Sequence, residues 1–278
     1  MIDLEKIKKY REEVLDVLSN NQFYFGTKVI NLNVDDKEIN YHRWLHPWQG
    51  DWELEYLFNS NSLKNISKLI KPNTTVLDIG AQTGNMSVAY SLFAKNVISF
   101  EPNPATYNVL EENSKLNKNI TPYNLACSDK EDILEFHYSD PGLCNGGYAS
   151  ILNNGVGVTS HTHPLEVYAV NVCDFVKKHH PNDINNISFI KIDTEGHDKD
   201  ILPTLKEIIK INKPIILTEI YDGLTEEETD QLIETINDLG YKAYDMNACG
   251  EDIDNLGEEI ISHKNIVQGS GHNLICLP

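Results

Sequence analysis

Short apolar runs alternate with helical segments along most of the chain beyond residue 61. The runs are VLDIG, NVISFEP, ITPYNLACSD, ISFIKID and PIILTEI, which begin at residues 76, 96, 120, 187 and 214. Helical spacing of apolar residues is found at 62–70, 85–95, 104–117, 197–210 and 225–240. Strands separated by helices in this way are typical of parallel sheets with crossover connections. The alternation therefore predicts an α/β fold built on a parallel sheet.

Residues 1–60 lack this alternation, and we assign them to an N-terminal segment that precedes a main domain at 61–278. The segment combines an amphipathic helix at 3–20, a strand or hairpin arm at 23–35 and an aromatic-rich patch at 41–58. All tryptophans of the chain fall in this patch, namely Trp44, Trp48 and Trp52. Because aromatic side chains offer large contact surfaces, the patch either packs on the main domain or forms a lid over an active site.

The 278-residue chain is acidic, with 42 Asp and Glu against 23 Lys and Arg and a net charge of −19. Phosphate groups are bound by positively charged protein surfaces, so nucleic acid and anionic membranes are disfavoured as partners. The N-terminus lacks the apolar centre of a secretory signal, and no apolar run could span a bilayer. Five scattered cysteines without a C-x-x-C pair indicate reduced thiols. We expect a soluble cytoplasmic protein whose oligomeric state is open, a homodimer included.

Three of the predicted strands end in acidic or turn-forming residues, in VLDIGAQTG, VISFEPNP and FIKIDTEGHD. In parallel sheets such ends meet at one crevice, where ligands bind. Glu101 follows Gly80 by 21 residues, which suits an acid that accepts hydrogen bonds from ribose hydroxyls. The turn has only Gly80 and Gly84, whereas dinucleotide sites use three glycines and a pyrophosphate. S-adenosylmethionine (SAM), which has no pyrophosphate, fits better than a nicotinamide cofactor.

Four motifs in order resemble the FkbM-type SAM-dependent methyltransferases over about residues 50–278. They are VLDIGAQTGNMS, FEPNPATYNVLEENSKLN, NLACSD and IKIDTEGHDKDIL. The resemblance implies a class I, Rossmann-like methyltransferase fold: a seven-stranded, mostly parallel sheet with an antiparallel last strand and helices on both faces. It also implies O-methylation of a hydroxyl on a sugar, glycan or secondary metabolite, with S-adenosylhomocysteine (SAH) as product. A nicotinamide-dependent oxidoreductase and a SAM-binding module without catalysis are the alternatives.

The resemblance also implies which residues contact the cofactor. Those at its methionine part are Asp78, Gly80, Ala81 and Gly84, with Gln82, Asn85 and Ser87 in the same turn and helix. Glu101 would hold the ribose beside Asn103, and Ser128 with Asp129 would face the adenine. The chain departs from the family at Gln82, at Thr83 and at Asp198, where Glu is common, so the role of position 198 is open.

The segment IKIDTEGHDKD concentrates acids at a strand end. We predict catalytic roles for Asp193, which the resemblance implies would sit near the transferred methyl, and for Glu195, with His197 as a candidate general base or else a solvated helix residue. Asp198 and Asp200 are explained as well by the preference of carboxylates for a helix N-terminus. A metal is not favoured, although Asp193 and Glu219 could offer oxygen ligands to Mg²⁺.

A Gly/Asn-rich loop at 139–164 lies between two predicted strands. Loops of this length in a compact domain are usually functional or mobile, and we predict that this loop and the aromatic patch close over the acceptor. His161 and His163 in the loop, and His42 and His46 in the patch, are candidates for metal or acceptor binding. Two histidines alone do not make a metal site.

Overall fold

The computed structural model describes residues 26–46, 53–139, 146–148, 162–246, 253–266 and 272–278, together with residues 5, 7–9 and 12. Of the predicted helix at 3–20, the described residues are helical and Ile7 is buried. The rest of that helix lies outside the described residues. So do Trp48, Trp52, His161 and most of the predicted loop. Among the described residues, no helix has the length and apolar character needed to cross a membrane.

The main sheet has the strand order β13-β12-β14-β11-β10-β3-β4-β5. Its strands are β3 (Thr75–Ile79), β4 (Asn96–Phe100), β5 (Ile120–Tyr123), β10 (Ile187–Ile192), β11 (Ile215–Ile220), β12 (Lys242–Met246), β13 (Glu259–Ile260) and β14 (His272–Leu277). Neighbours from β11 to β5 pair in parallel, whereas β14 is antiparallel to β11 and to β12. The predicted antiparallel last strand is confirmed. The predicted number of seven strands was wrong by one, because the two-residue strand β13 adds an edge to β12.

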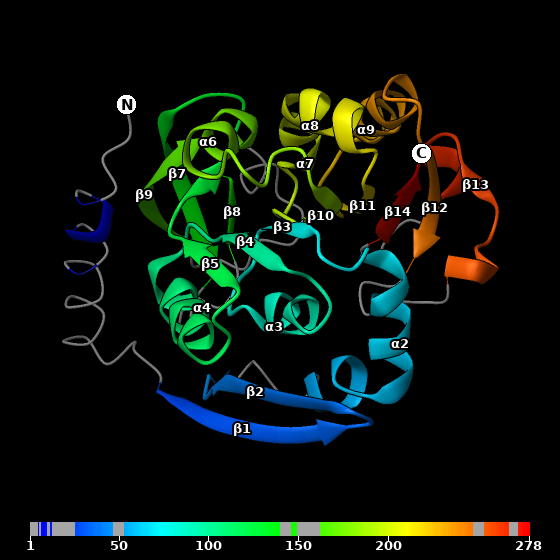
Figure 1. Ribbon diagram of the computed structural model, residues 1–278. Helices are drawn as coiled ribbons and strands as arrows, with labels where there is room; N and C mark the ends of the chain where they lie inside the picture. Colours follow the sequence, from blue (N-terminus) through cyan, green and yellow to red (C-terminus); the bar gives the residue numbers. More distant parts are fainter. Residues whose placement is uncertain are drawn as a thin grey trace.

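Helices cover both faces of this sheet (Figure 1). On one face lie α2 (Ser60–Leu69), α3 (Asn85–Ser91) and α4 (Pro104–Leu116), and on the other α6 (Val172–His179), α7 (Asp198–Ile201), α8 (Lys206–Asn212) and α9 (Glu226–Asp238). Side chains of a strand alternate between faces, so Val76 belongs to the core that includes Leu63 of α2, whereas Leu77 belongs to the core that includes Phe175 of α6. The sheet is therefore buried on both sides.

The predicted helix at 197–210 is broken in the structure. A 3₁₀ turn, η2 (Leu202–Leu205), separates α7 from α8. Pro203 lies in this turn, and proline has no N–H with which to continue an α-helix. Elsewhere side chains cap the helix starts as expected: Asn103 accepts from the N–H of Ala105 in α4, and Thr225 forms a capping box with Glu228 in α9.

A second sheet has the order β6-β9-β7-β8. It comprises β6 (Ala126–Cys127), β7 (Asp132–Ser139), β8 (Gly146–Tyr148) and β9 (Thr162–Val170). The single strand predicted at 120–129 was wrong, because the chain leaves the main sheet after β5 and enters this second sheet. Asn124 fixes that departure, since its side-chain amide donates to the carbonyl oxygens of Glu101 and Pro102 at 2.8 and 2.9 Å.

The N-terminal segment contributes an antiparallel hairpin, β1 (Thr27–Val34) and β2 (Lys37–Trp44), which confirms the predicted hairpin arm. The hairpin lies against α3 and α4 (Figure 1). Tyr41 and Trp44 are buried, and the ring of Tyr41 lies 4.8 Å from that of Phe58. The described part of the aromatic patch, which continues into a short π-helix (η1, Glu53–Leu57), is thus partly core, whereas Leu45, Leu54 and Tyr56 are exposed. The boundary at residue 60 stays a prediction.

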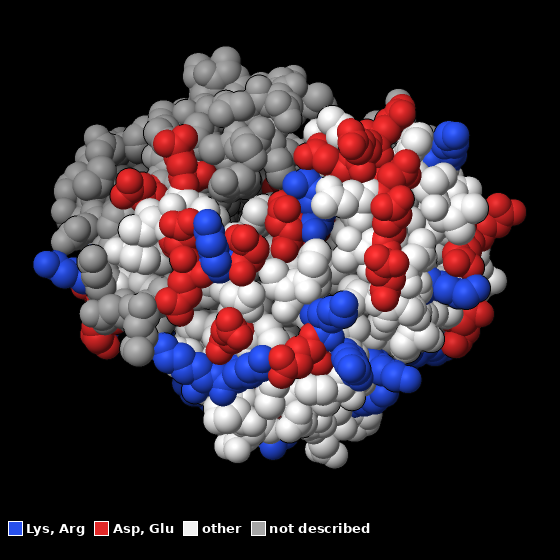
Figure 2. Space-filling model, turned by 90° about the horizontal axis from the view of Figure 1, so that it is seen from above, with Lys and Arg blue, Asp and Glu red and all other residues white. Residues whose placement is uncertain are grey.

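Two further short 3₁₀ turns, η3 (Ile253–Asn255) and η4 (His263–Asn265), precede the last strand. Figure 2 shows the molecule from above the view of Figure 1, with acidic side chains spread over much of the visible face. Lys and Arg gather mainly toward the lower edge of that view. The first turn of α9 holds three acids, Glu226, Glu227 and Glu228, and carboxylates there complement the helix dipole.

Candidate active site at the carboxyl ends of β3, β4 and β10

The carboxyl ends of the three acid-bearing strands meet, as predicted. The N–H groups of Gly80 and Ala81 both donate to the carbonyl oxygen of Phe100, at 3.0 and 2.9 Å. The N–H of Asp193 donates to the carbonyl oxygen of Ile79 at 3.1 Å. The end of β3 is therefore tied to β4 on one side and to β10 on the other.

The turn after β3 needs both of its glycines. Gly80 has a φ of 77°, and a Cβ there would lie 1.8 Å from the carbonyl oxygen of Asp193. Gly84 has a φ of 82°, and a Cβ would lie 2.5 Å from the side chain of Leu110. Gln82, between them, also has a positive φ of 50°. A non-glycine residue in this region is strained, and the sequence had given no sign of it.

Glu101 is buried at the end of β4 and organises the same turn. Its carboxylate accepts from the N–H of Gln82 and the N–H of Asn103, each at 2.8 Å, and from the hydroxyl of Thr106 at 3.0 Å. Burial raises the pKa of Glu101 to about 7, although these hydrogen bonds lower it. A carboxylate offers about four acceptor positions, so one position, on Oε2, remains for a ligand hydroxyl.

Several predicted cofactor residues lie beneath the turn. The hydroxyl of Ser87 donates to Oδ2 of Asp78 at 2.5 Å and lies 2.9 Å from the hydroxyl of Ser99. Asp78 and Ser87 are fully buried, and burial raises the pKa of Asp78. Asn85 and Ala81 are also buried. The structure thus shows these residues supporting the turn, and their contact with a cofactor stays a prediction.

Lys191 is a site residue that the sequence analysis missed. Its Nζ donates to the carbonyl oxygen of Gly80 at 2.7 Å and lies 3.2 Å from Oδ2 of Asp193 and 3.8 Å from Oδ1 of Asp78. Burial lowers the pKa of Lys191, but the two carboxylates outweigh burial and the net shift is upward. The ammonium is therefore charged. A lysine within the apolar run ISFIKID was the signal that could have found it.

The acids beyond β10 and β11 form one electrostatic group. The side chain of Asp193 is 34% exposed, so its carboxylate can reach a ligand. Burial raises the pKa of Glu219 to about 10, and repulsion from Asp193, Glu195 and Asp198 contributes to this rise. Within the described residues its Oε2 is buried without a hydrogen-bond partner. Burial and the neighbouring acids therefore favour the protonated form of Glu219.

Asp198 has a structural role, which resolves the departure from the family pattern at this position. Its carboxylate accepts from the N–H and the hydroxyl of Thr194, at 2.9 and 2.5 Å. It also accepts from the hydroxyl of Thr218 and the N–H of Glu219, at 2.8 and 2.9 Å. The side chain is fully buried, and burial raises its pKa. Asp198 thus fastens the turn after β10 to β11.

His197 faces the adenine-side residues that the sequence pointed to. Its Nε2 lies 3.2 Å from the hydroxyl of Ser128, and its Nδ1 lies 3.0 Å from Oδ2 of Asp200. Burial raises the pKa of Asp200, but hydrogen bonds from His197 and Lys199 outweigh burial and lower it. Ser128 is buried, whereas Asp129 is exposed and lies 3.2 Å from the Ser128 hydroxyl.

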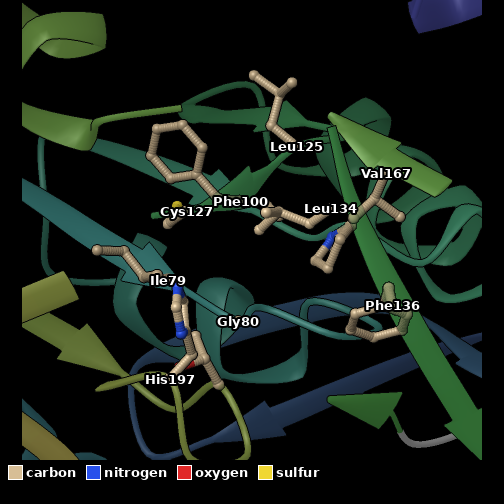
Figure 3. A pocket seen from close by; sticks show the side chains of 12 residues that line it. Ile79, Gly80, Phe100, Leu125, Cys127, Leu134, Phe136, Val167 and His197 are labelled. Atoms are coloured by element: carbon tan, nitrogen blue, oxygen red, sulfur yellow. The ribbon is translucent and has the colours of Figure 1, made fainter. Parts of the chain in front are cut away.

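An apolar pocket opens beside these strand ends (Figure 3). Its empty space, with the open solvent at its mouth included, is about 420 Å³. Its lining is Ile79, Gly80, Phe100, Pro102, Leu125, Ala126, Cys127, Leu134, Phe136, Val167, Thr194 and His197. The second sheet provides one wall through Leu134, Phe136 and Val167. The pocket thus joins the ends of β3, β4 and β10 to that sheet.

No metal centre is evident among the described residues, where no three His, Cys, Asp or Glu side chains are grouped to hold an ion. The histidines of the hairpin are engaged locally: His42 lies 2.9 Å from the hydroxyl of Thr27, and the ring of His46 lies 4.7 Å from that of Trp44. Cys127, Cys173 and Cys276 are buried and free.

The strand order, the antiparallel strand β14 between β11 and β12, and the glycine turn beside Glu101 together define a class I methyltransferase fold. The family model of the FkbM methyltransferase domain matches residues 78–243, more than half of the chain. The chain therefore belongs to the FkbM methyltransferase family. This membership favours methyl transfer over nicotinamide-dependent oxidoreduction.

Individual relatives are distant. A hexuronic acid methyltransferase, AglP, of Haloferax volcanii is 23% identical over 157 residues, which span 56% of this chain and 59% of that protein. The crystal structure of an FkbM methyltransferase from Methylobacillus flagellatus has a TM-score of 0.45 and 14% identity, covering 81% of this chain and 50% of that one. SMU.1697c from Streptococcus mutans, solved with SAH, has a TM-score of 0.42 and 12% identity, covering 78% and 94%.

Proposed function

We propose that the protein is a SAM-dependent O-methyltransferase whose acceptor is a hydroxyl of a sugar, a glycan or a secondary metabolite. The observation that carries the proposal is the meeting of Glu101, Asp193 and the Gly80 turn beside one apolar pocket. The hexuronic acid methyltransferase of Haloferax volcanii supports a sugar acceptor by similarity over part of its length.

The residues of the site fit SAM. The apolar pocket suits a purine ring, and the remaining acceptor position of Glu101 suits a ribose hydroxyl. The carboxylates of Asp78 and Asp193 lie near the turn with Lys191 between them, and the partly exposed Asp193 is the one that suits the positive sulfonium. When bound, SAM supplies an activated methyl group on sulfur.

The protein's own task is to align the acceptor and to remove one proton from its hydroxyl. Asp193 is our candidate for that proton acceptor, because its carboxylate is partly exposed and is held by Lys191 at 3.2 Å. Glu195 is the second candidate. Its φ of 55° is strained, and strain of this kind gathers at functional sites.

A metal is the alternative means of activating the hydroxyl. Asp193 and Glu219 are the oxygen ligands that we considered for Mg²⁺, which is commonly held by one or two carboxylates and completed by water. Within the described residues no third His, Cys, Asp or Glu is grouped with these two to hold an ion, and we therefore favour a base without a metal. Activity that survives exhaustive chelation by EDTA supports this choice, and activity restored only by Mg²⁺ or Mn²⁺ contradicts it.

The experiment that tests the function is methyl transfer from labelled SAM to a panel of neutral and uronic glycosides, with mass spectrometry of the product. We expect the label on oxygen. Asp193→Asn should lower turnover by about 10²–10⁴-fold, the usual contribution of a general base, while SAH still binds. Lys242→Met, which changes an exposed residue, is the matched control. Label on nitrogen or carbon, or no binding of SAH, contradicts the proposal.

A further inference from the structure

The acceptor is expected beside the candidate base Asp193, and this edge of the site is acidic. Strands β10 and β11 pair in parallel, with Ile192 opposite Thr218. Asp193 and Glu219 directly follow these two residues, so the two acids lie next to each other at the end of the sheet. Repulsion from Asp193 contributes to the raised pKa of Glu219, which agrees with this placement. An acceptor that approaches Asp193 therefore also meets Glu219.

The residues just beyond β11 add to this negative charge. The ring of Tyr221 lies against Gly223, where a Cβ would come within 2.5 Å of it. Burial raises the pKa of the Tyr221 hydroxyl, and the charges of Glu195, Glu219 and Asp222 raise it further. These three acids thus act on the same ring, and Asp222 is exposed. Together with Asp193 they form what we call the acidic edge.

The lysines closest to Glu195 in the sequence do not offset the acidic edge for a ligand. Lys191 is 7% exposed and lies between the carboxylates of Asp78 and Asp193. Lys199 is 13% exposed and pairs with Asp200 at 2.9 Å. Each ammonium is therefore already compensated by carboxylates of the protein.

The sequence offers few other cations with which to bind an anionic acceptor. Neither Lys nor Arg occurs between Lys130 and Lys177, a stretch that includes the loop at 139–164, which we predict to close over the acceptor. The whole chain has two arginines, Arg11 and Arg43, and Arg43 belongs to the hairpin that lies against α3 and α4. Ligand carboxylates are typically held by Arg, in bidentate pairs, or by Lys. A carboxylate on the acceptor would therefore lack its usual partner.

We propose that the acidic edge selects the charge of the acceptor, so that the methylated hydroxyl belongs to a molecule without an anionic group and uronic acids are rejected. The acids repel a carboxylate, and such repulsion is an effective source of specificity. The inference rests on the proposed function, because it concerns the acceptor of that methyl transfer. The chain then differs in the charge of its acceptor from the hexuronic acid methyltransferase of Haloferax volcanii.

A uronic acid and its primary amide are the matched probes, because they have nearly the same shape and differ in charge. We would measure methyl transfer from labelled SAM to the methyl glycosides of glucuronic, galacturonic and mannuronic acid and to their amides. Saturation-transfer NMR with the SAH-bound protein reports binding for pairs without turnover. The amide should be preferred by about 10-fold or more, in kcat/KM or in affinity. Raising NaCl from about 0.02 M to about 0.5 M should reduce the preference, because salt screens exposed charges.

Asp222→Lys tests the acidic edge itself, because it reverses an exposed charge outside the candidate catalytic residues. It should reduce the preference for the amide by about 3-fold or more. Asp238→Lys is the matched control, since Asp238 is also exposed and the change in net charge is the same. Helix α9 connects β11 to β12, which run parallel because both are antiparallel to β14. Asp238, at the end of α9, therefore lies toward the opposite end of the sheet, and the control should keep the wild-type preference.

The outcomes separate the two proposals. If SAH does not bind, or if the label is found on nitrogen or carbon, the proposed function fails. If SAH binds and a uronic acid equals or exceeds its amide, the function stands and the inference is overturned. The inference is also overturned if no amide reacts or binds. A preference that neither Asp222→Lys nor added salt reduces overturns it too, because shape rather than charge would then account for the preference.

Discussion

Replacing Lys191 by methionine tests the electrostatic design of the site. The ammonium of Lys191 lies between the carboxylates of Asp78 and Asp193 and also binds the carbonyl oxygen of Gly80. Its side chain is 7% exposed and that of Asp78 is fully buried. Methionine is unbranched, like lysine, and fills similar space, so Lys191→Met mainly removes the charge.

The expected loss of stability in Lys191→Met follows from this burial. Removing one partner of a buried ion pair typically costs about 3–5 kcal/mol, because the other charge is left uncompensated. Folded proteins are stable by only about 5–15 kcal/mol, so the variant should lose at least about a fifth of its free energy of unfolding. Part of this loss of stability should come from the turn that contains Gly80, because the hydrogen bond from Lys191 to the carbonyl oxygen of Gly80 is also removed.

The loss should also depend on pH. In the wild type burial raises the pKa of Asp78, and attraction to Lys191 lowers it. Without Lys191 the pKa of Asp78 in the folded protein rises further above its unfolded value. Between the unfolded and the folded pKa of Asp78, the folded state then binds more protons than the unfolded state. The free energy of unfolding therefore falls as pH rises through this range. We expect a smaller loss at pH 5 than at pH 8.

The assay is unfolding in urea at both pH values, followed by circular dichroism. Lys242→Met is the control, because the side chain of Lys242 is 64% exposed where it pairs with Glu259 at 2.8 Å, and exposed pairs contribute little. The control should unfold at the same urea concentration as the wild type. The reasoning is refuted if Lys191→Met behaves like the control, or if its loss is larger at pH 5 than at pH 8.

Three further predictions concern the cofactor turn and the loop. The affinity for SAH should rise from pH 6 to pH 8, because the pKa of Glu101 is about 7 and ribose hydroxyls bind the charged carboxylate. In calorimetry, Glu101→Gln should bind SAH more weakly, and its affinity should no longer depend on pH in this range. Gly80→Ala should lower the melting temperature and abolish SAH binding, because its Cβ would meet the carbonyl oxygen of Asp193; wild-type melting would contradict this. Deleting residues 149–158 should reduce methyl transfer and spare SAH affinity, whereas loss of SAH binding would assign the loop to the cofactor site.

Much of the fold could be predicted because its signals are local. Apolar runs between helical segments predict parallel strands, and the acids at their ends, Glu101 and Asp193, follow from that placement. The split of residues 120–129 between two sheets could not be predicted. It depends on Asn124 binding the carbonyl oxygens of Glu101 and Pro102, which is a contact between distant segments.

The arrangement inside the site was harder to predict, because it also depends on contacts between segments that are distant in the sequence. Sequence proximity grouped His197 with Asp193, but the left-handed residues Glu195 and Gly196 turn the chain and bring His197 to Ser128. Asp198 resembled an ordinary helix-capping acid, and only the folded structure shows its four donors. The buried Lys191 was visible in the sequence, but its partners were not.

The central claim is that the carboxyl ends of β3, β4 and β10, with the start of the second sheet, form the SAM site. Hydrogen–deuterium exchange with and without SAH tests it most directly, because it needs no acceptor and reports the location of binding. We predict slower exchange at residues 78–84, 101–106, 124–129 and 193–198, and unchanged exchange in α9. Absence of protection at saturating SAH, or protection confined to other segments, would contradict the claim.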